Sequence, residues 1–228
     1  MSNSHHKPNI ILKKSDREHT LINLELLGGG TEIVKKTKRL YDGEKFAYEE
    51  VEYIPVVLKI IEEIIDNGLD ENSRTMGDFA NDIKISIGDF EVEIEDNGRG
   101  VPTTEHEGNI QAIVAFTEAK TSGNFDHSTK SNSIGKFGVG SFLTNVCSKQ
   151  FTVVTADGTQ ELTLKCLNNA ESHTVDIKPS KKHFTKVTFT PDLALLKIDK
   201  IEDIYKRLIV TRLMHLSMLF SNIKFTIK

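Results

Sequence analysis

Residues 59–70 read Lys-Ile-Ile-Glu-Glu-Ile-Ile-Asp-Asn-Gly-Leu-Asp, and this stretch decides the fold that we expect. Its isoleucines, together with Val57, recur at the spacing of one helical face. The run follows Pro55, a residue that commonly stands at the start of a helix. We therefore predict a helix from about residue 56 to residue 69, with its apolar side buried.

The polar side of this helix carries Glu63, Asn67 and Asp70, which are spaced i, i+4 and i+7 and so share one face. An amide oxygen one turn from a carboxylate suits magnesium, which keeps most of its waters and also holds phosphate oxygens. Glu63 could then act as a general base on a water beside a terminal phosphate. The same spacing also fits a solvated polar face, and two glycine-rich stretches downstream bear on the choice.

Length and composition set the outer limits. The chain has 228 residues, which fits one large domain or a domain with an appendage. The net charge of −4 gives no general attraction to nucleic acid or an anionic membrane, so DNA contact would need a local patch or another domain. Cys147 and Cys166 lack metal-ligand spacing and are expected to be buried thiols in a reducing compartment. No apolar run approaches the ~18 residues of a membrane span, so we expect a soluble, cytoplasmic protein without membrane contact.

A predicted hairpin precedes the first glycine-rich stretch. Ile83, Ile85 and Ile87 alternate with polar residues, and 91–95 alternates again, so 83–95 reads as two antiparallel strands. The second strand ends at Asp96-Asn97-Gly98-Arg99-Gly100-Val101-Pro102. A carboxylate in a pocket walled by glycine backbone can accept a hydrogen bond from an exocyclic amine such as that of adenine. Asx-Gly pairs are also ordinary turn formers.

The remaining elements alternate between helices and strands. We expect a frayed segment at 1–10, an exposed charged loop or arm at 35–45, and a long polar loop at 120–137. Helices are expected at 109–119 and 198–218, and strands at 151–155, 161–167, 187–189 and 223–227. Because the strands come mainly as hairpins, a mixed sheet with helices packed on one face is the natural arrangement.

The second glycine-rich stretch is Gly135-Lys136-Phe137-Gly138-Val139-Gly140. Three glycines let the backbone approach a ligand closely, and the helix expected after them points its N-terminal N–H groups at an anion. The stretch lacks the strand before it and the Lys-Ser/Thr ending of a Walker A loop.

Taken together and in this order, the three stretches resemble the nucleotide-binding motifs of the Bergerat-fold (GHKL) ATPases. This family includes type II topoisomerases, MutL proteins, the ninety-kilodalton heat-shock chaperones and histidine kinases. Residues 63–71 resemble the Glu-x-x-Asp-Asn-x-x-Asp-Glu motif of the topoisomerase branch. Residues 138–148 resemble its Gly-x-Gly-x-x-x-x-Asn-x-x-Ser motif, and 185–189 its adenine-side strand. The likeness covers roughly 50–228 and is greatest to the large-subunit ATPase region of T-even-like phage topoisomerases.

The resemblance implies an α+β fold: a two-layer α/β sandwich of the Bergerat type, with a mixed, mostly antiparallel sheet and helices on one face. It implies an N-terminal arm and lead-in segment at 1–50, and an ATPase domain at 51–228 with a lid at about 105–140. The chain departs from the family near its N-terminus, where the nucleotide-contacting tyrosine has no counterpart, and at Phe184, where the family usually has glycine.

The resemblance also implies residue roles. Glu63 would activate water, Asn67 would hold magnesium, and Asp70 would support the same site. Asp96 would bind the adenine amine directly, and Thr185 would bind it through water. Residues expected to shape the base pocket are Gly98, Arg99, Gly100, Val101 and Pro102. Residues expected to cradle the phosphates are Gly135, Gly138, Val139 and Gly140. Lys136 or Lys130 would either neutralise charge there or be solvated.

The implied function is ATP binding and hydrolysis, with magnesium, in a type II DNA topoisomerase, an isomerase. Nucleotide-driven pairing of two protomers would gate passage of one DNA duplex through another. Contacts with DNA would be made by domains that this chain lacks, and other topoisomerase subunits would be partners. Because the family's phosphate-contacting lysine belongs to a transducer domain absent here, we expect slow hydrolysis by this chain alone. The alternative is a MutL-like module in which ATP binding switches a partner surface.

Overall fold

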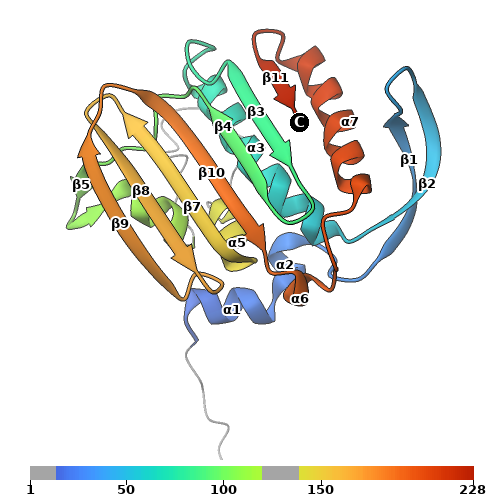
Figure 1. Cartoon of the computed structure of the whole chain (residues 1–228), viewed down its shortest axis with the longest axis horizontal. Helices are drawn as coiled ribbons and strands as arrows, with labels where there is room; N and C mark the ends of the chain where they lie inside the picture. Colours follow the sequence, from blue (N-terminus) through green and yellow to red (C-terminus); the bar gives the residue numbers. More distant parts are fainter. Residues whose placement is uncertain (1–13, 120–138) are drawn as a thin grey trace, which may run out of the picture.

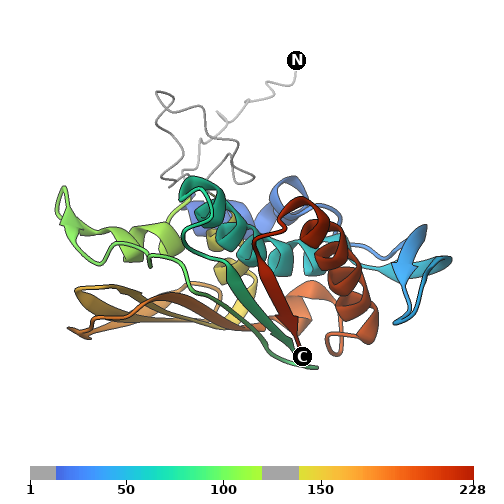
Figure 2. The same cartoon turned by 90° about the horizontal axis from the view of Figure 1, so that it is seen from above.

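A seven-stranded sheet forms the centre of the molecule and helices cover one of its faces (Figures 1 and 2). The computed structural model describes residues 14–119 and 139–228. The strands of the sheet are β3 (Asp82–Ile87), β4 (Val92–Asp96), β7 (Ser148–Asp157), β8 (Gln160–Leu167), β9 (Ser172–Pro179), β10 (His183–Pro191) and β11 (Lys224–Ile227). Their spatial order is β11-β3-β4-β10-β7-β8-β9.

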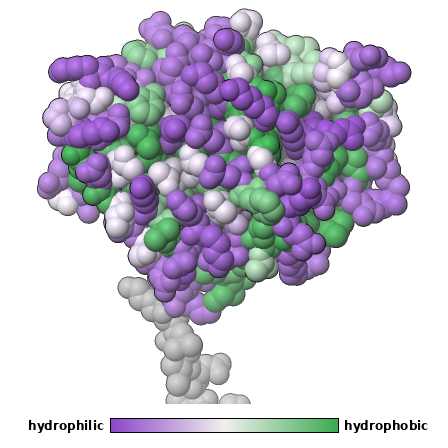
Figure 3. Space-filling view, in the orientation of Figure 1, coloured by the Kyte–Doolittle hydropathy of each residue, from purple (hydrophilic) through white to green (hydrophobic). Residues whose placement is uncertain are grey.

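The sheet is mixed and mostly antiparallel, as predicted. Every neighbouring pair is antiparallel except β11 and β3, which run parallel. The expected hairpin of β3 and β4 is confirmed, with Ile85 opposite Ile94. Strand β9 was not predicted, because all of its residues are exposed and it carries no buried apolar alternation. The opposite face of the sheet, turned to the viewer in Figure 3, is largely polar.

Helix α3 (Pro55–Arg74) is the long helix that the isoleucine spacing predicts. It begins with Pro55 and continues to residue 74, five residues beyond the expected end, where the Thr75 N–H bonds back to the Glu71 carbonyl. Ile60, Ile61 and Ile65 are at most 1% exposed. Shortening any of these side chains to alanine should cost roughly 2–5 kcal/mol, so this face anchors the helix to the sheet.

Other helices pack beside α3 or at the edge of the sheet. These are α4 (Gln111–Thr117), α5 (Gly140–Val146), the short α6 (Leu193–Leu196) and α7 (Asp203–Leu219). Helix α5 lies against α3, where the Thr144 hydroxyl donates to the Ile60 carbonyl at 3.0 Å. Arg212 of α7 bonds to Asp66 of α3 at 2.6 Å, which ties the last long helix to the central one.

Residues 14–53 contain more helix and strand than the sequence indicated. Helices α1 (Asp16–Ile22) and α2 (Leu24–Gly28) precede a hairpin of β1 (Val34–Tyr41) and β2 (Phe46–Tyr53). Residues 35–45 are mostly exposed, as expected, but they form most of β1 and the turn after it, so the expectation of a loop is wrong. It failed because the buried side chains of the hairpin, such as Leu40 and Val51, stand among many charged residues. The hairpin lies against α7, where the Tyr41 N–H bonds to Thr211.

The boundary expected after residue 50 falls inside β2, and the division into domains remains a prediction. Within the lid predicted at 105–140, residues 105–119 form β5 (Glu105–His106), β6 (Asn109–Ile110) and α4. Residues 120–138 lie outside the described part, so the lid also remains a prediction. None of the described helices is both long and apolar enough to cross a membrane.

Candidate functional site

Three rows of side chains cross the helix-covered face of the sheet, because every second residue of a strand points to that face. Two rows are apolar from β3 to β8. The first row is Ile85, Ile94, Val187, Val153 and Leu164. The second row is Ile87, Val92, Phe189, Phe151 and Cys166. The third row reads Ile83, Asp96, Thr185, Thr155, Leu162. Its three central positions are polar, and we name Asp96, Thr185 and Thr155 the polar row.

Asp96 ends β4 and is partly buried. Burial raises the pKa of Asp96 to about 7, and nearby Glu71 and Glu95 also raise it, although a hydrogen bond from the Gly98 N–H opposes the shift. That N–H lies 2.8 Å from Asp96 Oδ1. A carboxylate that is hard to ionise in the free protein is poised to accept a hydrogen bond from a ligand, which would stabilise its charge.

The loop after Asp96 is held by close backbone approach. Gly100 has a φ of 83°, and a Cβ there would lie 2.0 Å from the Ala156 carbonyl oxygen, so only glycine fits. The Val101 N–H donates to Thr155 Oγ1 at 2.8 Å. Arg99 contacts Glu71 with its Nε at 2.6 Å and with a second guanidinium nitrogen at 3.2 Å. The loop is thus fixed to α3 and to β7 together.

Pro102 and Asp157 make further hydrogen bonds that fix the loop after Asp96. The Pro102 carbonyl accepts the Ala112 N–H, which connects the loop to α4. Asp157 accepts the Thr103 N–H at 2.9 Å and the Thr103 hydroxyl at 2.7 Å. Burial raises the pKa of Asp157, but hydrogen bonds from Thr159, Thr103 and Gln160 outweigh it and hold the carboxyl well below its usual range. Asp157 therefore acts as a charged anchor at neutral pH.

Glu63 lies at the meeting of α3 and α5. A Cβ on Gly140 would fall 1.7 Å from Glu63 Oε2, so the carboxylate touches the glycine at the start of α5. Lys59, one turn earlier on α3, forms an ion pair with Glu63. The Asn67 side-chain nitrogen donates to Ser141 Oγ at 2.9 Å, so the Asn67 side-chain oxygen is not used in this hydrogen bond. Asp70 is also on α3 and is buried.

Gly68 of α3 lies between Asp96 and the Glu63–Asn67 face of the helix. A Cβ on Gly68 would be 3.6 Å from Asp96 Cβ and 2.9 Å from Ile83 Cδ1, so α3 packs closely on the sheet beside Asp96. Asn67 precedes Gly68, and Glu63 lies one turn further back. The structure therefore brings the polar helix face, the strand-end aspartate and the start of α5 to one side of the sheet.

The structure does not describe every predicted site residue. Gly135, Lys136, Gly138 and Lys130 lie outside the described residues. Val139 is the residue that precedes α5. The sequence patterns did not identify Thr155 or Lys59 as site residues. Glu71 is part of the motif at 63–71, but its contact with Arg99 was not predicted. A polar residue at an inward position of the alternation Phe151, Val153, Thr155 was the available signal.

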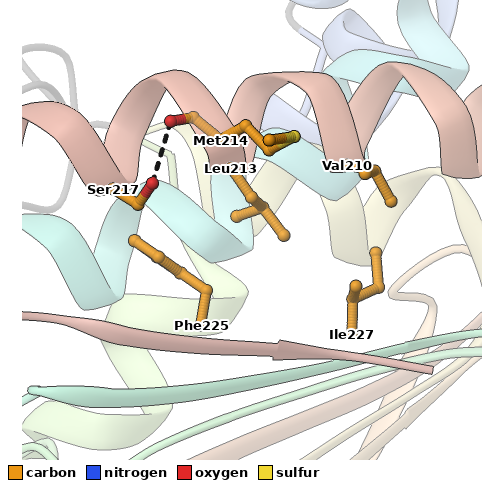
Figure 4. A pocket seen from close by; sticks show the side chains of 6 residues that line it. All are labelled: Val210, Leu213, Met214, Ser217, Phe225 and Ile227. Atoms are coloured by element: carbon orange, nitrogen blue, oxygen red, sulfur yellow. Dashed lines mark hydrogen bonds between the residues drawn. The ribbon is translucent and has the colours of Figure 1, made fainter. Parts of the chain in front are cut away.

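An apolar cavity of about 220 Å³ lies elsewhere, between α7 and β11 (Figure 4). It is lined by Val210, Leu213, Met214, Ser217, Phe225 and Ile227. The Ser217 hydroxyl is bonded to the Met214 carbonyl at 2.8 Å. None of the lining residues carries a charge, so this cavity does not suit a phosphorylated ligand and is not part of the site.

Comparison with known proteins places this geometry in context. In the solved structures, the ATPase region of Saccharomyces cerevisiae topoisomerase II bound to dexrazoxane matches with a TM-score of 0.89 and 26% identity, covering 95% of this chain and 60% of that one. The ATPase and transducer domains of Balamuthia mandrillaris topoisomerase II also match with a TM-score of 0.89, at 25% identity, covering 95% and 59%. These likenesses confirm the predicted fold class.

Curated relatives agree with the structures. The DNA topoisomerase large subunit of Enterobacteria phage T4 is 35% identical over 210 residues, which cover 86% of this chain and 41% of that protein. Drosophila melanogaster DNA topoisomerase 2 is 31% identical, covering 84% and 14%. The chain thus spans less than half the length of these relatives. Residues 54–195 match the family described as histidine kinase-, DNA gyrase B- and HSP90-like ATPase, and the chain belongs to that family.

Proposed function

We propose that this chain binds and hydrolyses ATP at the polar row and the adjoining face of α3, as the ATPase domain of a type II DNA topoisomerase. The observation that carries the proposal is the meeting of Asp96 with the Asn67–Gly68 segment of α3. A partly buried acceptor for the base and a carboxylate for the phosphate end then share one site. The relatives are topoisomerases, and nothing in the comparisons favours the MutL-like alternative.

Asp96 and Thr185 would bind the base. The exocyclic amine of adenine has N–H groups to donate, and the Asp96 carboxylate is an acceptor at the end of a strand. Thr185 is the cross-strand partner of Asp96 in the sheet, so the two side chains are neighbours on one face. Gly98 and Gly100 keep the loop close to the sheet, and a side chain at either position would collide with its neighbours.

Glu63 would take a proton from the attacking water. Its carboxylate is mostly buried, is held by Lys59 and abuts Gly140. A positioned carboxylate base contributes roughly 10²–10⁴ to a rate. Phosphoryl transfer depends mainly on positioning and on charge stabilisation, so the fixed placement of Glu63 is the structural requirement here.

Magnesium fits the donors on this face of α3. Asn67 offers an amide oxygen because its nitrogen is engaged by Ser141, and Glu63 offers a carboxylate one turn away. No group of three or more histidine, cysteine, aspartate or glutamate side chains that could hold a metal occurs in 14–119 and 139–228. A magnesium ion held by Asn67 and by phosphate oxygens would neutralise phosphate charge.

The proposal extends to the larger enzyme. Nucleotide binding would favour pairing of two protomers, and hydrolysis would release them, which would gate DNA passage. Contacts with DNA and with other topoisomerase subunits would involve regions beyond the matched part of the relatives. A sedimentation experiment with and without a non-hydrolysable ATP analogue tests the pairing, which should appear only when nucleotide is present.

A calorimetric titration with magnesium ATP tests the site itself. Wild type should bind, and Asp96→Asn should lose its preference for ATP over GTP because an amide can also donate to a carbonyl. The matched control is Asp89→Asn, at an exposed aspartate in the turn between β3 and β4, which should behave as wild type. Unchanged selectivity in Asp96→Asn would show that the base is bound elsewhere.

A further inference from the structure

Thr155 is a buried residue of the polar row that the proposed chemistry leaves without a role. Its side chain is 0% exposed, so it does not reach a ligand itself. Its hydroxyl oxygen nevertheless makes three contacts: the Val101 N–H at 2.8 Å, the Phe184 carbonyl at 3.2 Å and the Thr185 hydroxyl at 3.2 Å. These contacts link the loop after Asp96 to β10.

A count of protons decides the direction of these hydrogen bonds. A threonine hydroxyl has one proton and two lone pairs. The Val101 N–H can only donate and the Phe184 carbonyl can only accept, so all three contacts are hydrogen bonds at once only when the proton of Thr155 goes to Phe184. The remaining lone pair of Thr155 then accepts the proton of Thr185. Thr185 is left with lone pairs only, and it stands beside Asp96 in the sheet.

We propose that Thr155 is a positioning residue that turns the Thr185 hydroxyl into an acceptor, so that Asp96 and Thr185 together select a purine with an amino group over one with a carbonyl. The inference rests on the proposed nucleotide site and adds a specificity determinant to it. Two neighbouring acceptors match the two N–H groups of the adenine amine, Asp96 directly and Thr185 through a water that donates to Thr185 and accepts from the amine. Against the carbonyl of guanine or hypoxanthine, the same two acceptors would be left without hydrogens.

The test is the ratio of affinities for magnesium ADP and magnesium IDP, which differ in the group on C6 and in the hydrogen that hypoxanthine carries on N1. Diphosphates avoid turnover, and a buffer near pH 8.5 keeps Asp96 ionised so that it cannot donate to the carbonyl. Thr155→Val keeps the shape of the side chain but removes the hydroxyl and frees the Thr185 proton. We expect the ADP-to-IDP preference to fall by about tenfold, the worth of one hydrogen bond.

Further variants separate positioning from structure. Thr155→Ser retains the hydroxyl and should retain the preference. Thr185→Val should lose it, and adding Thr155→Val to that variant should cause no further loss. Thr152→Val changes a threonine of β7 that points to the opposite face of the sheet, next to Lys165, and should behave as wild type. If Thr155→Val does not fold, Thr155→Cys, with its weak donor and acceptor, should show an intermediate preference.

The outcomes are distinguishable. If wild type prefers ADP and Thr155→Val weakens both nucleotides equally, Thr155 is structural and the inference is overturned while the nucleotide site stands. A matching loss of preference in Thr152→Val would overturn it as well. If wild type binds neither nucleotide, the proposed function fails and the inference fails with it.

Discussion

The two ends of the candidate site are built differently. At the base end, Asp96, Thr185 and Thr155 belong to three adjacent strands, and the following loop is fixed by hydrogen bonds to α3, β7 and α4. At the phosphate end, Glu63 contacts Gly140 and Asn67 contacts Ser141, both in the first turn of α5. Sheet register therefore pre-forms the base end, whereas the phosphate end depends on how two helices meet.

This difference separates recognition from turnover. Changes at the base end should alter stability and nucleotide preference, because those side chains are part of the sheet. Changes at the phosphate end should alter the rate of hydrolysis and leave the fold intact. Single substitutions at the two ends test that division.

Glu63→Gln should have the largest effect. The amide keeps the size of the side chain but cannot take a proton, so we expect ATP turnover to fall by about 10³-fold. Binding of a non-hydrolysable ATP analogue and the urea unfolding midpoint should stay close to wild type. Steady-state turnover and calorimetry measure the two quantities. Turnover that survives the change would assign the base to another group.

Gly100→Ala should chiefly reduce stability. The new Cβ would sit 2.0 Å from the Ala156 carbonyl oxygen, at a φ of 83° that L-residues rarely adopt. Backbone strain and overpacking together should lower the free energy of unfolding by about 3 kcal/mol. Gly43→Ala is the matched control, because Gly43 also has a positive φ but nothing lies within 4 Å of its Cβ position. Equal losses in the two variants would show that strain alone matters.

Asp96→Asn should raise the stability of the free protein. The folded pKa of Asp96 is about 7, above its ordinary value of 3.8, so between these values the folded state holds a proton that the unfolded state has lost. This contribution to stability is full below pH 3.8 and is lost as the pH rises through 7. Near pH 8 the variant should therefore be more stable, by about 2 kcal/mol after allowance for partial exposure.

Two controls sharpen that prediction. Near pH 5 the gain in urea unfolding should shrink, because wild-type Asp96 is then largely protonated. Adding magnesium ATP near pH 8 should stabilise wild type more than the variant and so reverse their order. A variant that is less stable than wild type at both pH values would mean that the charge of Asp96 stabilises the fold.

The sequence predicts some residues of the base end and of the phosphate end and misses others. The isoleucine spacing of α3 and the alternation in β3 and β4 place Glu63, Asn67 and Asp96, because both patterns follow from burial. Thr155 was missed because its role depends on register between strands that are distant in sequence, which the one-dimensional pattern does not contain. The β1–β2 hairpin was missed for a related reason, since its few buried residues are covered by α7, over 150 residues later.

Lys59→Met should have the smallest effect and is confined to the phosphate end. Lys59 is the basic side chain that, within residues 14–119 and 139–228, forms an ion pair with Glu63. Removing its charge should let the carboxylate swing away from its place against Gly140, and a displaced catalytic group loses rate rather than binding. We expect turnover to fall about tenfold, with analogue affinity within about threefold of wild type. Lys59→Arg should recover most of the rate, because it restores the cation one turn from Glu63.

The matched control is Lys84→Met, which breaks an exposed ion pair with Glu95 at 2.9 Å on the outer face of the sheet. It should leave the turnover rate and the analogue affinity unchanged. A loss of affinity that accompanies the loss of rate in Lys59→Met would place the ammonium on the nucleotide itself, and the phosphate end would then contain a cation of its own.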